Sequence, residues 1–197
     1  MQSKLNWKLS KLRQNKAMSE TDVFARTLLE ESKAFLDNAK KSTAKPSIQA
    51  HLHASLLLCI SSLEAHLHSI CEDFLARGDV GVLDRSILEE HEIRLEHGEF
   101  VVTSALKMYR LEERFEYIYR RFSGKSLPRT ESWWADLKAG LDIRNQIVHP
   151  KASLELRYED VSRTLLAVIS GLNSIYRAIY KKRFPTHRLG LDSRLNL

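Results

Sequence analysis

Glycine and proline, the residues that most often interrupt helices, are scarce in this chain, whose 197 residues contain only seven glycines and four prolines. Residues that favour helices, such as Leu, Glu, Lys, Arg and Ala, dominate instead. We therefore expect long helices joined by short connections, with little room for strands. With 43% hydrophobic residues, the chain can bury one sizeable core, which predicts a single main domain.

Cysteines and long hydrophobic runs are also scarce. Cys59 and Cys71 are the two cysteines, and in one helix they would lie about 18 Å apart, too far for a disulfide bond. The longest apolar run, around residues 56–60, is far too short to span a bilayer, and no signal peptide is evident. These absences predict a protein of the reducing cytoplasm that does not enter the membrane.

The net charge of +6 is concentrated at the two ends of the chain. Residues 1–16 carry five Lys or Arg and no acid, and residues 177–197 carry six with one acid, which leaves −4 for the body between them. Basic ends suit a polyanionic partner such as RNA, because Lys and Arg bound to phosphates release counterions. Solvated chain ends explain the same pattern equally well.

The sequence divides into three regions. Residues 1–18 form a basic amphipathic segment, residues 19–184 a helical domain, and residues 185–197 a basic C-terminal tail. In the first region Leu5 and Leu9 share one side of a helix, with basic residues around them. We expect this segment to dock on the domain, and binding to a membrane surface is the alternative.

The spacing of apolar residues predicts an all-α fold, an up-and-down bundle of four main helices with extra N-terminal and short helices. Helices are expected over residues 19–41, 48–77, 99–122, 131–149 and 158–183, with a short charged helix over 84–97. Phe24 and Leu28 should face inward in the first of these helices, and Met108 in the third. Residues 89–90 and 112–113, two pairs of glutamates, fit solvated helix faces.

The helix that precedes Pro150 contains one charged residue in its apolar stripe. Arg144 lies between Leu141 and Val148, where an apolar residue is expected. A guanidinium at such a position is costly unless it is paired or faces a cleft or an interface. The stripe therefore singles out Arg144 as a candidate functional residue.

A second face of this helix carries Asp142, Asn145 and His149, at positions i, i+3 and i+7. Asn145 is expected to hydrogen-bond the His149 ring, and His149 lies where the negative end of the helix dipole favours imidazolium. An Arg that binds phosphate oxygens and a His that transfers a proton can cleave RNA through its own 2′-hydroxyl, without a metal or cofactor. A structural Arg that caps helix ends would show the same spacing.

The string from Arg144 to Pro150, RNQIVHP, lies late in a helical chain and is followed by one long helix. It resembles the HEPN family, whose motif is Arg, four to six residues, then His, often with a polar residue after the Arg. The resemblance covers residues 48–183. HEPN proteins are helical bundles that pair so that two motifs face one cleft, and many are metal-independent endoribonucleases of toxin–antitoxin, abortive-infection and CRISPR-linked systems.

The resemblance implies a role for each residue of the motif. Arg144 would stabilise the charged phosphorane, His149 would transfer a proton or position phosphate, and Asn145 would orient both, with Asp142 in support. The implied partners are RNA, a second copy of the chain, and an antitoxin or sensor protein. Some family members lack activity, so the alternative is a catalytically inactive HEPN module that binds a protein or nucleic acid.

Helix geometry makes the second copy part of this prediction. Five residues of an α-helix place Arg144 and His149 about 140° apart around the axis, so they do not share a face. The long Arg side chain, a distorted last turn or a second subunit could bring them together. Glu64, on the expected second helix, is a candidate partner for Arg144, and the alternative is a boundary Glu that faces water.

Histidines and tryptophans supply the remaining candidates. Two His-x-His pairs, at residues 51 and 53 and at residues 66 and 68, would point to opposite sides of a helix, so we predict no metal site. Trp133 and Trp134 are candidates for stacking on RNA bases, but we expect one in the core and the other at an interface.

Overall fold

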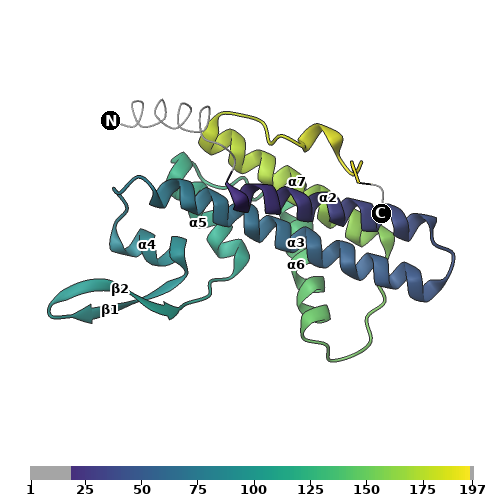
Figure 1. Ribbon diagram of the computed structural model, residues 1–197, viewed down its shortest axis with the longest axis horizontal. Helices are drawn as coiled ribbons and strands as arrows, with labels where there is room; N and C mark the ends of the chain where they lie inside the picture. The colour runs from purple at the N-terminus through teal and green to yellow at the C-terminus, as the bar shows by residue number, and fades with distance from the viewer. Residues whose placement is uncertain (1–18, 196–197) are drawn as a thin grey trace.

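The computed structural model describes residues 19–195 and has the mostly all-α fold that the sequence predicts (Figure 1). The α-helices are α2 (Glu20–Lys41), α3 (Lys45–Leu75), α4 (Val82–Glu89), α5 (Leu111–Ser123), α6 (Ser132–Val148) and α7 (Tyr158–Tyr180). A hairpin of β1 (His91–Glu96) and β2 (Glu99–Leu106) follows α4, and a 3-10 turn, η1 (His187–Leu189), follows α7. The predicted amphipathic segment 1–18 lies outside the described residues.

Small side chains let α2 pack closely against α3. Ser32 and Ser55 are buried, and each hydroxyl donates to the backbone carbonyl of the other residue at 2.8 Å. The Ser62 hydroxyl donates to the carbonyl of Ala25, also at 2.8 Å. These bonds satisfy polar groups that the close packing removes from water.

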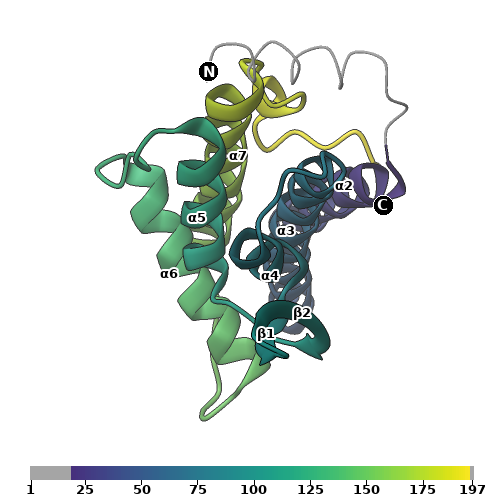
Figure 2. The ribbon, with the colours of Figure 1, turned by 90° about the vertical axis from the view of Figure 1, so that its left-hand side faces the viewer.

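Helices α3 and α7 supply most of the core. Figure 2 shows α5, α6 and α7 on one side of the molecule and α2, α3 and α4 on the other. The apolar stripe that the sequence predicts for the last helix is buried along its whole length, at Val161, Leu165, Val168, Leu172, Ile175 and Ile179. Each such side chain contributes about 1.5–3 kcal/mol by leaving water.

One helix of the described residues, α3, is long and apolar enough to cross a membrane. Its most apolar window has a mean hydropathy of 1.3, and most of that window is buried inside the protein. Burial of this extent is what the core helix of a soluble protein shows. The apolar character of α3 is therefore explained by its packing.

The β1–β2 hairpin corrects the helices predicted over residues 84–97 and 99–122, because the helices of this region span only 82–89 and 111–123. β-branched and aromatic residues at Ile93 and at 100–103 favour strands. His97 and Gly98 form the turn with φ values of 51° and 88°, as two-residue hairpin turns require. Met108 consequently lies outside any helix and is 75% exposed.

Two further predictions of side-chain position are wrong or incomplete. Phe24 is 59% exposed, although Leu28 on the same helix is buried as expected. Trp133 and Trp134 are both buried, because both indoles pack against the ring of Phe115, so neither lies at an exposed interface.

Residues 185–195, which the sequence assigns to a basic tail, lie against α2. The ammonium of Lys33 is fully buried and donates to Glu30 at 3.1 Å and to the carbonyl of Asp192 at 3.4 Å. The backbone N–H of Arg194 donates to Glu30 at 2.8 Å. The described part of the tail therefore belongs to the packed domain.

Helix α6 packs tightly against α7 at a glycine. A Cβ atom added at Gly140 would lie 2.2 Å from Cγ2 and 2.9 Å from Cβ of Thr164, which is buried. Gly140 is one helical turn before Arg144, so this contact sets the position of the end of α6 relative to the core.

Candidate functional site

The predicted motif lies at the end of α6, where the helix ends one residue before His149. The backbone of His149 leaves the helical region at φ −124° and ψ 67°, as expected for a residue that precedes Pro150. Its N–H still donates to the carbonyl of Asn145 at 2.9 Å, and its side chain is exposed. His149 is therefore accessible to a substrate or to another chain.

The Arg144 guanidinium is held by two side chains. It donates through Nη2 to Oε1 of Glu64 on α3 at 3.3 Å and through Nη1 to Oδ1 of Asn145 at 3.2 Å. The predicted pairing of Glu64 with Arg144 is confirmed. The Asn145 side chain contacts Arg144, whereas the sequence analysis expected it to contact the His149 ring.

A cleft of about 820 Å³ lies beside this ion pair. Its walls come from α3, α5 and α6 and from the connection between β2 and α5, with Thr21 of α2 and Glu90 at the end of α4. Four predicted site residues line it: Glu64, Asp142, Arg144 and Asn145. His149 is not among its lining residues. One chain thus gathers the Arg144 cluster in a cleft and leaves His149 at the exposed end of the helix.

The Glu64–Arg144 ion pair is a single, partly exposed contact. Burial raises the pKa of the Glu64 carboxyl above its ordinary range, the positive charge of Arg144 lowers it, and the negative charge of Glu90 raises it again. The two side chains make one contact at 3.3 Å and remain 31% and 43% exposed. Such pairs contribute little, whereas a phosphate can bind both arms of a guanidinium.

A second guanidinium, that of Arg114, forms another part of the cleft wall and was missed by the sequence analysis. Arg114 on α5 is 5% exposed and pairs with Glu90 at 2.6 Å. It also donates to the carbonyl of Leu88 at 2.9 Å. The signal that could have found it is the one that identified Arg144, a charged residue within an apolar helical stripe.

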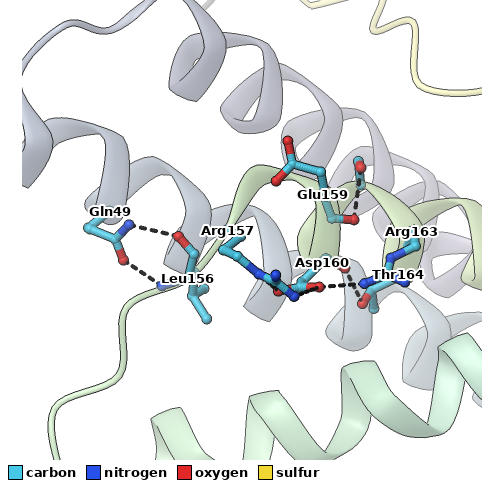
Figure 3. Close-up of polar contacts among 8 residues, drawn as sticks. Gln49, Leu156, Arg157, Glu159, Asp160, Arg163 and Thr164 are labelled. Carbon is cyan, nitrogen blue, oxygen red and sulfur yellow. Dashed lines mark hydrogen bonds and ion pairs between the residues drawn. The ribbon is translucent and has the colours of Figure 1, made fainter.

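The connection between α6 and α7 is fixed where it reaches α7 (Figure 3). The Gln49 side chain donates to the carbonyl of Leu156 at 2.9 Å and accepts from its N–H at 2.8 Å. Asp160 accepts hydrogen bonds from Arg157 and Arg163, which hold the pKa of that carboxyl below its usual range. The residues that follow the motif are therefore tied to α3 and to the first turn of α7.

Residues 19–195 contain no group of three or more His, Cys, Asp or Glu side chains placed to hold a metal ion. Within one His-x-His pair, His66 packs edge-on against Phe184 while His68 contacts Glu72 at 3.5 Å. Both cysteines are free and buried, and burial raises the pKa of Cys71 to about 11.

A second recess, of about 500 Å³, lies near the start of α6. Trp133 and the acidic Glu131 line it together with three basic residues, Lys125, Arg177 and His187. They come from three separate segments, so sequence spacing gave no sign of the recess. We call it the basic recess.

Comparison with protein-family models, with curated proteins and with solved structures gives no match to this chain.

Proposed function

We propose that this protein is a cytoplasmic, HEPN-like endoribonuclease that cleaves RNA without a metal ion, as a toxin or anti-phage defence component. The observation that carries the proposal is the position of Arg144. It replaces an apolar residue at the end of α6, lines an open cleft, and is steered by Glu64 and Asn145 while remaining partly exposed. An Arg in an apolar stripe that is neither fully buried nor fully paired can bind an anion such as phosphate.

The chemistry needs charge stabilisation and proton transfer. The 2′-oxygen of RNA bonds to phosphorus and loses its proton, and the bond from phosphorus to the 5′-oxygen breaks as that oxygen gains a proton. The products are a 2′,3′-cyclic phosphate and a 5′-hydroxyl. Arg144 exchanges Glu64 for the phosphate and stabilises the pentacoordinate state, and His149 transfers a proton.

A second copy of the chain completes the site in this proposal. His149 does not line the cleft that holds Arg144 of the same chain, and the histidine that does line it, His68, contacts Glu72 at 3.5 Å. In this proposal the partner's His149 therefore reaches the cleft. The basic recess supports an RNA substrate, since Lys125, Arg177 and His187 can bind phosphates that extend beyond the scissile bond.

The alternative function is a catalytically inactive HEPN module that binds a protein or nucleic acid through the same cleft. The separation of His149 from the cleft favours it, because a binding module needs Arg144 but no proton carrier. The two functions differ in one measurable property, the cleavage of RNA.

The test is cleavage of bulk cellular RNA in EDTA by the wild type, Arg144→Ala and His149→Ala. The matched control is Arg120→Ala, which removes an exposed Arg from α5. We expect the wild type and the control to cleave and both motif variants to lose at least about 100-fold in rate, as removal of a charge-stabilising or proton-transfer group does. Light scattering should confirm that all four have the same mass.

Each result has a distinct meaning. RNA binding without cleavage by the wild type would support the inactive module, and cleavage that survives both motif substitutions would refute the proposed site.

A further inference from the structure

The β1–β2 hairpin has one apolar face and one polar face. In its register Ile93 lies opposite Val102 and Leu95 lies opposite Phe100. Side chains alternate along a strand, so these four residues share a face. Leu95 and Phe100 are each 65% exposed, and Figure 1 shows the hairpin projecting from the helices. The outer half of the apolar face is therefore presented to solvent.

A hairpin of this kind is incomplete by itself. Two-stranded sheets are marginally stable in water, and three or more strands with a covered apolar face are usually needed. Within the described residues β1 pairs only with β2, so its other edge is open. Open edges with exposed apolar side chains are sites at which another strand adds.

The charges of β1 indicate which strand adds. Glu92, Arg94 and Glu96 alternate with the apolar residues and therefore share the polar face. In one antiparallel register of two β1 strands, Ile93 of each copy lies opposite Ile93 of the other, and each Arg94 then lies opposite Glu92 of the other copy. In a second register Leu95 lies opposite Leu95, and each Arg94 lies opposite Glu96 of the other copy. In both registers the charges are complementary and the apolar faces join on one side of the sheet.

We propose that a second copy of this chain pairs with the hairpin through β1 and forms a four-stranded antiparallel sheet. The occupant is the same chain because the edge is complementary to itself, as a two-fold interface requires. Met108, which follows β2, is 75% exposed and lines the Arg144 cleft, so the chain that leaves the hairpin forms part of the cleft wall. This pairing identifies the surface through which the two copies of the proposed function would associate. It rests on the proposed function only for what the dimer does.

The first experiment measures mass by analytical ultracentrifugation over a range of concentrations. The wild type should be a dimer, and Leu95→Ser should raise its dissociation constant about 100-fold, because each of the two copies loses a large buried side chain. The matched control is Leu166→Ser, which removes an exposed Leu from α7. Circular dichroism should show that both variants stay folded.

The second experiment is a charge exchange. Arg94→Glu and the double variant Glu92→Arg/Glu96→Arg should each be monomers, because like charges face one another at every β1–β1 pair. Mixed together, the two should form a heterodimer of wild-type mass. Arg183→Glu, a reversal of an exposed charge beyond α7, should leave the homodimer intact.

A monomeric wild type, or a dimer that Leu95→Ser and Arg94→Glu leave unchanged, would overturn the inference. RNA cleavage is recorded on the same samples. If the hairpin variants disrupt the dimer but the wild type does not cleave RNA, only the proposed function is refuted. If the wild type cleaves RNA and the hairpin variants remain dimers, only the interface is refuted.

Discussion

Replacement of Glu90 by Gln removes the carboxylate that neutralises a buried guanidinium in the cleft wall. The Arg114 side chain is 5% exposed, the Glu90 side chain 19%, and their nitrogen–oxygen distance is 2.6 Å. Removal of one partner from a buried ion pair costs about 3–5 kcal/mol. Arg114 keeps its hydrogen bond to the carbonyl of Leu88, and the Glu90 side chain is partly exposed to solvent. We therefore expect the free energy of unfolding to fall by about 3 kcal/mol, the lower end of this range.

Chemical denaturation measures this loss as a shift of the midpoint at constant slope. The matched control, Glu113→Gln, changes an exposed residue beside Arg114 and should stay within about 0.5 kcal/mol of the wild type. Adding Arg114→Met to Glu90→Gln should recover part of the loss, because no unpaired charge remains buried. If Glu90→Gln lowers the free energy of unfolding no more than Glu113→Gln does, the Arg114–Glu90 pair does not stabilise the cleft wall.

Two further substitutions test the packing of α6 and the electrostatics of the cleft. Gly140→Ala should lower the free energy of unfolding by about 1–3 kcal/mol, because the methyl group meets Thr164, and denaturation would contradict this if the variant matched the wild type. Since the pKa of Glu64 is raised on folding, the native state binds its proton more tightly, so this residue's contribution to stability falls as pH rises through the raised pKa. Glu64→Gln should remove this residue's part of the slope of unfolding free energy against pH. Identical slopes for the wild type and the variant would exclude a raised pKa of Glu64.

The helices and one contact of the site follow from the sequence because both depend on local patterns. Apolar spacing predicted α2, α3, α6 and α7 to within a few residues of their ends. Arg144 stood out because a charge within an apolar stripe needs a partner, and Glu64 was the acidic residue on the apolar surface of the preceding long helix. A periodic apolar pattern and the cost of burying a charge were therefore sufficient to predict these helices and the Arg144–Glu64 contact.

The hairpin could not be predicted in this way, and the Arg114–Glu90 pair was missed with it, although Arg114 lies in an apolar helical stripe as Arg144 does. Residues 84–97 are rich in charge and were predicted to be helical, and the turn at His97-Gly98 is a weaker signal than Asn-Gly or Asp-Gly. Once Glu90 was assigned to a helix, its carboxylate appeared solvated. Its left-handed conformation at the end of α4, with φ 56°, turns the chain into β1 next to Arg114.

The contacts of Glu64 define the resting state of the cleft. A carboxylate that is partly desolvated is costly, and the raised pKa of Glu64 expresses that cost. Arg144 offsets only part of it through one contact at 3.3 Å. In the proposed function, a phosphate that binds both arms of Arg144 would form a stronger pair than this single contact, at the cost of leaving Glu64 without its cation. Glu64 would then orient the guanidinium in the resting cleft while holding it less tightly than phosphate does.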